Sequence, residues 1–513
     1  QKDGRVVIVA NGSANIEQLR KQSDLPMLAR LSGSAPYHGE VHINKRNADL
    51  IVDSTLSGVA STLPAPFGKT AGESLPLHFE KRLLPSAPVR KGQKNAKGDS
   101  IARDQIVATL GQALSMQLIR RKQAQGFVIE RGAIGIGRAQ ALPDSGLALA
   151  LNLPALDVDE WRRLLSQSAE KTGENGSDGP DFETISVKTP ELKVLGRRYQ
   201  DVDLTAGQSG GQWRAQLSSR QVSGDLHWDG SGRGRLIARL KQLAIGESDD
   251  SAALSPDSVD SGKELPALDV VAEEFRIGER RFGKLELLAK NEAGIWKLNR
   301  LQMSNPHGTL TGSGQWAMTG GKNQTRMEFK VDSPDVGKLL DRLGYVGAVK
   351  STTARLEGQL GWRGSPVAFD FASLNGEMAL EAGRGQFLKL DPGAGKLLGL
   401  LSLQGLPRRI ALDFRDVFSE GFAFDSIAGK LAVQNGIMRT ERLQIDGTAA
   451  RVIMRGEVDL SHETQRLTVN VQPELGGTAA LGVAFINPVA GVATLLAHKV
   501  LQNPLNQMFG FDY

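Results

Sequence analysis

Three polar side chains in the segment His38-Gly-Glu40-Val-His42 have types and a spacing that could hold a metal ion. If this segment is a β-strand, alternate residues point to the same side, so two imidazoles and a carboxylate share one face. Zinc prefers such ligands, but the helical zinc motifs have a different spacing, and no further ligand follows nearby. We therefore interpret these residues as the polar face of a solvated strand and expect no metal.

Other short motifs do not complete a catalytic or cofactor site. The segment Gly393-Ala-Gly395-Lys396 superficially matches a phosphate loop, but Leu390 stands where the first glycine belongs, and Leu397 where Ser or Thr is needed. Gly135-Ile-Gly137 has no third glycine at dinucleotide-binding spacing, and no Gly-x-Ser-x-Gly elbow is present. The chain has no cysteine, which excludes disulfides, thiolate ligands and cysteine nucleophiles. We expect no enzyme activity and no cofactor.

The elements that would position any site are β-strands. Near the C-terminus, Val452, Met454 and Val458 have one parity, whereas Arg451 and Arg455 have the other. Such alternation is typical of a sheet with one apolar face and one wet face. A related unit, in which strands and glycine turns alternate, recurs irregularly at residues 202–228, 284–316 and 430–458, which indicates repeated β-meanders.

These patterns predict a mainly β fold: an elongated, twisted antiparallel β-groove built of repeated β-meanders. Short helices at 157–165 and 333–343 begin with capping residues and acidic first turns, and they would cap sheet edges. Polar segments at 90–104, 166–183 and 246–264 read as long loops between strands. We divide the chain into an N-terminal β segment (1–90), a middle β segment with polar loops (91–265), a C-terminal β region (266–475) and an apolar helical tail (476–513).

Composition limits the partners. The chain has 513 residues, a net charge of +5 and a pI of about 9.2, with basic residues scattered among acidic ones. Nucleic-acid binding usually needs a concentrated basic patch, so we do not expect a nucleic-acid partner. Weak attraction to an anionic lipid surface is compatible with this charge. The chain starts at Gln1 without a leader, and we interpret it as part of a longer or processed protein.

The segment from Leu475 to Phe511 carries only one formal charge, at Lys499. Its pattern predicts a helix over 489–502 that would rise roughly 21 Å, which is less than the roughly 30 Å of a bilayer core. Three readings stay open: a helix packed across the end of the sheet, a helix contacting a membrane, and a true span. For membrane contact the candidates are Leu481, Val483, Phe485, Val489, Val492, Leu495, Leu496, Val500 and Leu501.

Several longer motifs resemble the YhdP branch of the AsmA-like envelope proteins. They lie at Ser54–Lys69, Leu153–Trp161, Leu400–Asp425 and Asn487–Leu505, so the resemblance covers nearly the whole chain. It implies the C-terminal periplasmic portion of a large Gram-negative protein, with an inner-membrane helix that precedes this portion. It also implies a twisted apolar β-groove that moves phospholipid between the inner and outer membranes, a lipid-bearing membrane surface as a partner, and an unidentified envelope protein as a second partner.

Both lines of reasoning lead to a groove that shields acyl chains while headgroups stay in water. Shared strand parity assigns its lining to Leu285, Leu287, Trp296, Leu298, Ile410, Leu412, Phe414, Phe422, Phe424, Leu443, Ile445, Val452, Met454, Leu467, Val469 and Val471. The principal hypothesis is bridge-like phospholipid transport across the periplasm without covalent chemistry. The alternative is a structural or assembly factor of the envelope, whose sheet is covered by its own side chains and helices.

Overall fold

The computed structural model describes residues 5–22, 26–44, 47–87, 101–123, 126–164, 181–194, 196–245, 265–319, 322–350, 352–366, 369–388, 422–448, 450–462, 464–473 and 511–512. Its contacts divide the chain into two units, Gln1–Asp229 and Gly230–Tyr513. Each unit is mainly β, with an open, twisted sheet and few helices, as the sequence predicts. The four segments expected from the sequence stay a prediction.

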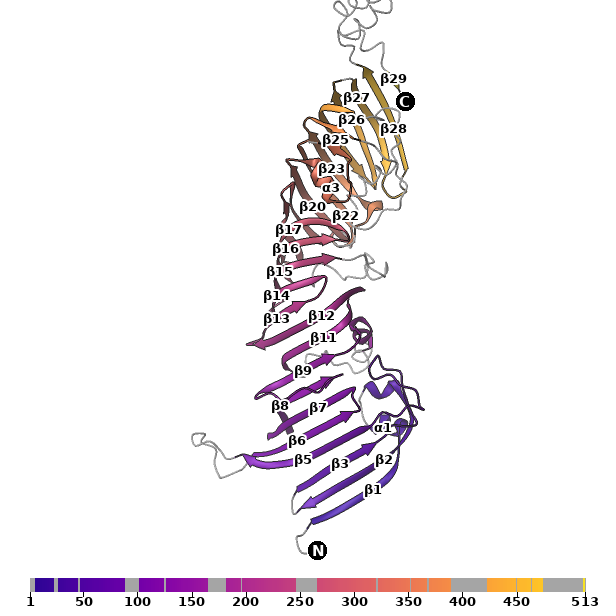
Figure 1. Ribbon diagram of the computed structural model, residues 1–513, viewed down its shortest axis with the longest axis vertical. Helices are drawn as coiled ribbons and strands as arrows, with labels where there is room; N and C mark the ends of the chain where they lie inside the picture. The colour runs from indigo at the N-terminus through magenta and orange to yellow at the C-terminus, as the bar shows by residue number, and fades with distance from the viewer. Residues whose placement is uncertain are drawn as a thin grey trace, which may run out of the picture. The chain divides into compact units, whose positions relative to one another are not determined.

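In unit 1, hydrogen-bonded neighbours follow chain order (Figure 1). The sheet contains β1 (Arg5–Asn15), β2 (Leu31–Asn44), β3 (Asn47–Ser54), β5 (Leu77–Ala87), β6 (Ile101–Leu110), β7 (Leu114–Gln123), β8 (Gly126–Ile136), β9 (Gly146–Asn152), β11 (Phe182–Val194), β12 (Arg197–Ser209), β13 (Gln212–Ser218) and β14 (Val222–Asp229). Short pieces accompany it: β4 (Val59–Ser61), β10 (Leu156–Asp157), α1 (Ile16–Gln22) and the 3-10 turn η1 (Pro26–Arg30).

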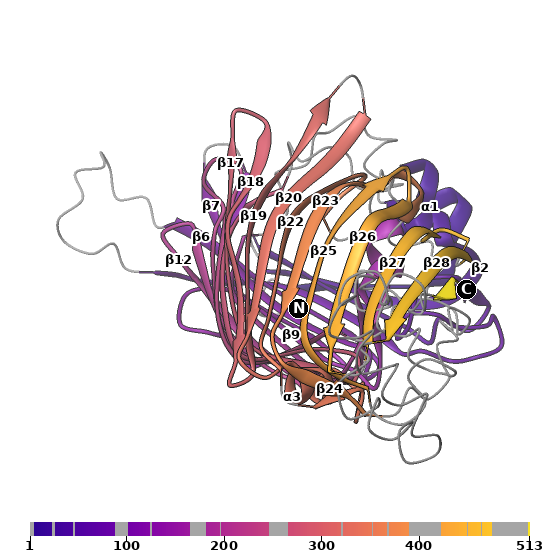
Figure 2. The ribbon, with the colours of Figure 1, turned by 90° about the horizontal axis from the view of Figure 1, so that it is seen from above.

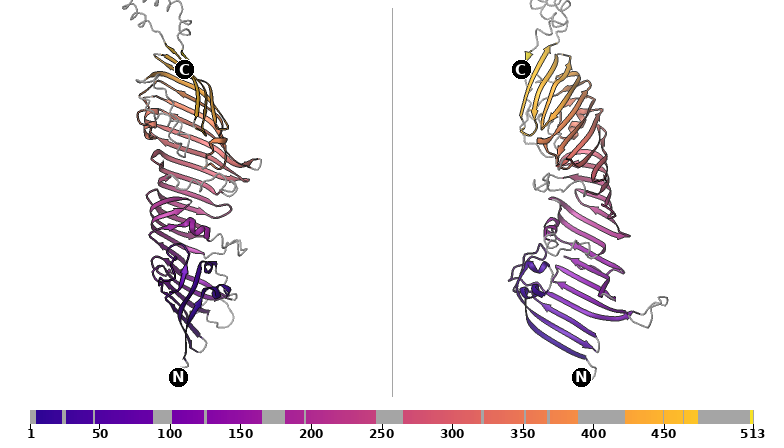
Figure 3. Two further views of the ribbon diagram at one scale, coloured as in Figure 1. Left: turned by 90° about the vertical axis from the view of Figure 1, so that its right-hand side faces the viewer. Right: turned by 180° about the vertical axis from the view of Figure 1, so that it is seen from behind.

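Unit 2 repeats this arrangement, and the chain colours run in order across it in both views of Figure 3. Its sheet contains β15 (Arg235–Ile245), β16 (Ala267–Ile277), β17 (Arg280–Glu292), β18 (Ile295–Asn305), β19 (Gly308–Thr319), β20 (Lys322–Ser333), β22 (Ala354–Arg363), β23 (Asn375–Ala382), β25 (Ala423–Gln434), β26 (Ile437–Gly447), β27 (Ala450–Asp459), β28 (Thr464–Pro473) and β29 (Phe511–Asp512). The short elements are β21 (Val349–Lys350), β24 (Gly385–Phe387), α3 (Val336–Arg342) and the 3-10 turn η3 (Phe371–Ser373). Strands β20 to β28 curve in a common direction when seen from above (Figure 2).

The sheets are mixed rather than wholly antiparallel, which differs from the sequence prediction. Strands β8 and β9, β9 and β11, β10 and β11, and β15 and β16 pair in parallel. Parallel neighbours need a connection that carries the chain back across the sheet, which a two-residue hairpin does not provide. Residues 137–145, 153–181 and 246–266 make these connections in the chain.

The three repeats expected from the sequence are antiparallel meanders: β12–β13–β14, β17–β18–β19 and β25–β26–β27. The first hairpin of each turns through two residues with positive φ, at Gly210–Gly211, Ala293–Gly294 and Asn435–Gly436. Two successive positive φ values define the type I′ turn, whose twist matches that of the flanking strands. The glycine turns read from the sequence are therefore confirmed.

Both short helices are also confirmed. Residues 158–164 are helical, and the Asp157 carboxylate accepts a hydrogen bond from the Glu160 N–H at 2.8 Å. Helix α3 begins after Asp335, whose carboxylate accepts from the Lys338 N–H at 3.1 Å. Each aspartate satisfies a backbone donor that the first helical turn leaves without a partner. The caps that the sequence shows therefore mark where these helices start.

Three segment assignments need correction. The polar segment expected as a loop over 90–104 ends earlier, because β6 begins at Ile101 and includes Asp104. At the end of the expected helical tail, Phe511–Asp512 form β29 and pair with β28. The loop expected over 166–183 also ends earlier, because Phe182 and Glu183 belong to β11. The rest of the tail, residues 166–180 and the expected loop at 246–264 lie outside the described residues.

Candidate functional site: an apolar sheet face and a charged cluster

The register of unit 2 aligns its apolar residues into rows that cross the strands. The longest described row runs from β15 to β28 and contains Leu240, Ala272, Leu285, Met303, Leu310, Val331, Leu356, Leu380, Gly429, Leu443, Met454 and Val469. A second contains Ala238, Val270, Leu287, Leu301, Gly312, Phe329, Gly358, Met378 and Leu431. A third contains Leu236, Leu268, Ala289, Leu298, Gly314, Met327, Leu360, Gly376, Val433, Met438 and Val458.

The rows lie on one face because register partners in a sheet point the same way. None of the three contains a charged residue. We call this surface of unit 2 the apolar face. Most of its long side chains in β16 to β20 are half-buried, whereas Met378, Val433 and Val458 are buried.

Glycines on the apolar face sit beside large side chains. Gly358 pairs with Phe329 on one neighbouring strand and with Met378 on the other. A Cβ on Gly358 would lie 2.3 Å from the Glu377 carbonyl oxygen and 2.9 Å from Met378 Cγ. Strands β22 and β23 therefore approach so closely here that only glycine fits at position 358. The large side chains of Phe329 and Met378 lie on either side of this glycine.

The opposite face of the same strands is charged. Arg355 Nε donates to Asp332 Oδ1 at 2.9 Å across β20 and β22, and Arg439 Nε donates to Glu457 Oε2 at 3.1 Å across β26 and β27. A hollow of about 1550 Å³ lies on this polar face between β19 and β26, lined by Ser313, Glu328, Lys330, Glu377, Lys430 and Arg439 among others. Because both acidic and basic side chains line this hollow, it does not favour anionic ligands over cationic ones, or the reverse.

The structure places the described members of the expected groove lining on the apolar face. Their register partners connect them, as in Leu443 with Met454 and Ile445 with Val452. Trp296, Phe424, Val452 and Val469 are buried, and Leu287, Phe422, Leu467 and Val471 are half-buried. Ile410, Leu412 and Phe414 lie outside the described residues. Whether any of these side chains lines a lipid path stays a prediction.

Part of the apolar face in unit 2 is covered by the chain itself. Phe369, which precedes η3, and Phe371, its first residue, pack on a buried cluster that includes Trp362, Leu374 and Met438. A neighbouring cluster around Phe424 and Val452 contacts Val349 and Phe387. The strands from β22 onwards therefore bury much of their apolar surface without a ligand.

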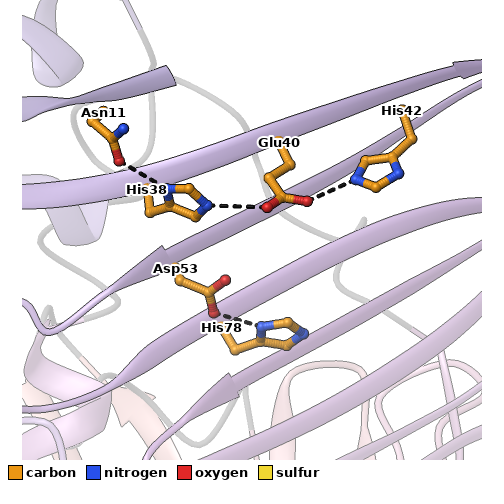
Figure 4. A network of polar contacts seen from close by, with 6 residues as sticks. All are labelled: Asn11, His38, Glu40, His42, Asp53 and His78. Atoms are coloured by element: carbon orange, nitrogen blue, oxygen red, sulfur yellow. Dashed lines mark hydrogen bonds and ion pairs between the residues drawn. The ribbon is translucent and has the colours of Figure 1, made fainter. Parts of the chain in front are cut away.

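The segment that suggested a metal site holds a hydrogen-bonded network instead (Figure 4). Glu40 lies between two imidazoles, with its carboxylate oxygens 3.1 Å from His38 Nε2 and 2.7 Å from His42 Nε2. These contacts, led by the one to His42, hold the pKa of Glu40 below its usual value. On the neighbouring strands β3 and β5, the register partners Asp53 and His78 lie close, with His78 Nδ1 2.7 Å from Asp53 Oδ1. Among the residues described, no group of three or more His, Cys, Asp or Glu side chains is placed to hold a metal ion.

A second charged cluster, which the sequence reading missed, lies in unit 1. Asp104 on β6 is completely buried and accepts two hydrogen bonds from Arg120 on β7, from Nε at 2.9 Å and from Nη2 at 2.7 Å. Lys81 Nζ on β5 lies 3.9 Å from the same carboxylate. The sequence does contain a signal for this position. Asp104 has the same parity as Ile106, Ala108 and Leu110, so in a strand its side chain lies on their apolar face.

Two sequence motifs behind the family resemblance have a structural role. Lys69 closes the loop that begins at Ser54, since its ammonium donates to the carbonyls of Leu56 and Val59 at 3.0 and 2.5 Å. Trp161 from helical residues 158–164 packs on the apolar side chains of β9 and β11, and Phe67 meets it edge-on at 5.9 Å between ring centroids.

The expected membrane-contact residues, Leu481 to Leu501, lie outside the described residues. Within the described part of the chain, no helix is both long and apolar enough to cross a membrane. The sequence prediction for this tail therefore stays open.

Comparison with known proteins agrees with the resemblance noted above. The family described as YhdP protein matches residues 1–513. The intermembrane phospholipid transporter YhdP of Escherichia coli (strain K12) is 25% identical over 490 residues, which covers 92% of this chain and 37% of that protein. The chain thus spans little more than a third of the length of this curated relative. No solved structure matches significantly. Because the family matches from the first residue to the last, the chain belongs to the YhdP protein family.

Proposed function

We propose that this chain is part of a phospholipid transporter, and that its apolar sheet face shields acyl chains while headgroups remain in water. The observation that carries the proposal is the set of uncharged rows crossing unit 2. The similarity to an intermembrane phospholipid transporter supports it. No covalent chemistry is required, because moving a lipid along a surface breaks no bond.

The length of the rows and the energy gained by covering acyl chains suit an extended lipid path rather than a single lipid pocket. At about 4.8 Å between strands, a row that crosses eleven strands extends for roughly 48 Å. Acyl chains in one leaflet occupy roughly half of a bilayer core of about 30 Å, so the row is longer than one lipid tail. Each methylene covered contributes about 0.8 kcal/mol wherever the surface is apolar. A uniform row therefore retains a lipid without one strongly preferred stopping place.

The half-buried leucines of β16 to β18 are the positions we assign to lipid contact, with Leu287 as the central example. The strands from β22 onwards favour the second candidate function, a structural factor, because Phe369 and Phe371 already cover their apolar side chains. The two functions predict opposite results for a lipid probe placed on β17.

We place this activity in the periplasm of a Gram-negative envelope, with the whole protein anchored in the inner membrane by a helix outside this chain. The tail at Leu481–Leu501 would contact a lipid surface, which we assign to the outer membrane, and its low charge supports this assignment. An envelope protein as a docking partner completes the proposal.

Adjacent leucines provide a matched test. Leu287 and Leu288 are both half-buried, but Leu287 pairs with Val270 and Leu301 on the apolar face, whereas Leu288 pairs with Asp269 and Arg300 on the opposite face. A photo-crosslinking amino acid at 287 should capture phospholipid in cells, and the same group at 288 should not. Mass spectrometry of the crosslinked protein measures both.

Equal capture at both positions would refute a single lipid-bearing face. No capture at either position, with a full β signal in circular dichroism, would favour the structural factor. A second pair extends the test to β27: Met454 lies on the apolar face, and Arg455 lies on the other.

A further inference from the structure

Three neighbouring charged residues of unit 1 lie in rows that also contain apolar side chains. Lys81 occupies a row position between Leu50 on β3 and Ile106 on β6, and Ile106 continues the row to Leu118 on β7. Asp104 pairs with Arg120 in the adjacent row, which continues to Ile129 on β8. Two cations and one carboxylate therefore share a face with Ile106 and Leu118.

The carboxylate is fully committed to the protein. Asp104 has no exposed side-chain surface and is bound by Nε and Nη2 of Arg120. Removing two charges from water is costly, and a buried pair often stabilises a fold no more than apolar residues would. A role for these charges outside folding would account for their place on an apolar face.

The two cations, Lys81 and Arg120, differ in how closely they contact the Asp104 carboxylate. At 3.9 Å, Lys81 Nζ is too far from Asp104 to form a hydrogen bond, and 39% of the Lys81 side chain is exposed. Arg120 is 24% exposed, and its Nη1 group is not used in binding Asp104. Both cations flank the Phe127 ring, 5.9 and 5.0 Å from its centroid. One carboxylate against two cations leaves a net charge of +1 beside apolar side chains.

We propose that Lys81 and Arg120 bind the phosphodiester of a glycerophospholipid headgroup while its acyl chains lie on Ile106 and Leu118. This inference rests on the proposed function, since it assumes that lipid occupies the apolar surface. A phosphodiester carries one negative charge, which balances the excess cation, and its oxygens accept hydrogen bonds from ammonium and guanidinium groups.

Neighbouring residues fit the rest of such a lipid. Phe127 and Ile129 are large apolar side chains that remain 37% and 40% exposed next to the cations. Apolar side chains beside a partly exposed ammonium match an amphiphile in which glycerol joins the charged phosphodiester to the acyl chains. A free phosphate would use the cations and leave these side chains in water.

The test compares three ligands by isothermal titration calorimetry of the purified chain: monomeric dihexanoylphosphatidylglycerol, dihexanoylglycerol and inorganic phosphate. The variants are Lys81→Gln, which removes the charge, and Lys81→Arg, which keeps it. The control is Lys188→Gln, because Lys188 lies on the polar face of β11 opposite Asp203 and is 71% exposed. Circular dichroism verifies that each variant keeps its β signal.

We expect the wild type to bind the phospholipid at least about tenfold more tightly than the neutral glyceride, because hydrogen bonds between charged groups typically contribute more than 1.4 kcal/mol. Lys81→Gln should remove this preference and leave binding of the glyceride unchanged. Lys81→Arg should retain most of the preference, and Lys188→Gln all of it.

Three results would overturn the inference. Equal wild-type affinity for the two lipids would refute the headgroup site but leave the apolar surface intact. Inorganic phosphate binding as tightly as the phospholipid would assign the cations to a free anion. Binding of neither lipid would count against the proposed function itself.

Discussion

The rows that contain Ile106 and Ile129 in unit 1 also include Lys81, Asp104 and Arg120, whereas the three rows described in unit 2 contain only apolar residues and glycine. A charged group on an apolar surface creates a position that a lipid headgroup prefers. A uniform row offers equal affinity at each step and favours movement. If lipid occupies both surfaces as we propose, the charged cluster of unit 1 would hold an amphiphile, and the rows of unit 2 would let it move along.

The largest expected effect comes from breaking the charged cluster of unit 1. Arg120→Met leaves Asp104 buried with Lys81 beyond hydrogen-bond reach, and loss of one partner from a buried pair typically costs about 3–5 kcal/mol of the free energy of unfolding. Urea denaturation measures this loss. Arg355→Met is the matched control, because its bond to Asp332 is half-exposed on the polar face of unit 2 and should contribute much less to the free energy of unfolding. Similar losses in both variants would remove the distinction between the two surfaces.

The second prediction concerns the uniformity of unit 2. Leu287→Asp puts a carboxylate into an uncharged row. Contact with acyl chains would remove this unpaired charge from water, so the phospholipid bound per protein should fall roughly tenfold. Leu288→Asp adds the same charge to the opposite face, beside Arg300, and should leave the bound lipid unchanged. Native mass spectrometry counts the lipid. A similar reduction in both variants would point to general destabilisation.

The third prediction concerns close strand packing on the apolar face. In Gly358→Ala the new methyl group would meet the Glu377 carbonyl oxygen, so strands must separate at a loss of about 1–3 kcal/mol of unfolding free energy. Gly72→Ala is the control, because a Cβ there meets nothing within 4 Å, and a change within about 0.5 kcal/mol is expected. Thermal unfolding compares the two. If Gly358→Ala unfolds at the same temperature as wild type, β22 and β23 can separate at this point with little loss of stability.

The smallest effect is acid sensitivity at a turn of unit 2. The Ser461 hydroxyl and the His462 backbone N–H donate to Asp459 and lower the pKa of its carboxyl group in the folded protein. A lowered folded pKa gives stability that is present above the unfolded pKa of about 3.9 and is lost as pH falls below it. Asp459→Asn should therefore be less stable than wild type at pH 7, and urea midpoints should converge towards pH 2.5. A constant difference between the two proteins at both pH values would contradict this.

Local chemistry explains which expectations the structure confirms. Asp157 and Asp335 satisfy helix donors a few residues away, and the paired turn residues at 210–211 and 435–436 reverse the chain over a short distance. Alternation is local too, so the parity of Val452 and Met454 correctly placed them on one face with Leu443 and Ile445. These features depend on contacts along the chain or between adjacent strands of a hairpin.

The parallel pairs and the charged cluster were not predicted, because both depend on how one strand aligns with another and not on the pattern within a single strand. Alternation within β15 is compatible with a parallel or an antiparallel neighbour, so it does not fix the direction of β16. Asp104 was grouped with a basic loop, although its parity agrees with Ile106. Its partner Arg120 is recognisable only once β6 and β7 are aligned.

The sequence by itself determined that the protein is built from alternating strands with one apolar face, because side-chain direction has period two wherever a strand forms. It also determined the turns and helix starts, since glycine conformation and aspartate capping act within a few residues. Only the tertiary structure decided which residues meet across strands: the continuous rows of unit 2, the bulky neighbours of Gly358, and the burial of Asp104 between Lys81 and Arg120. The physical reason is register, because a one-residue shift in the pairing of a strand would send the side chains of that strand to the opposite face.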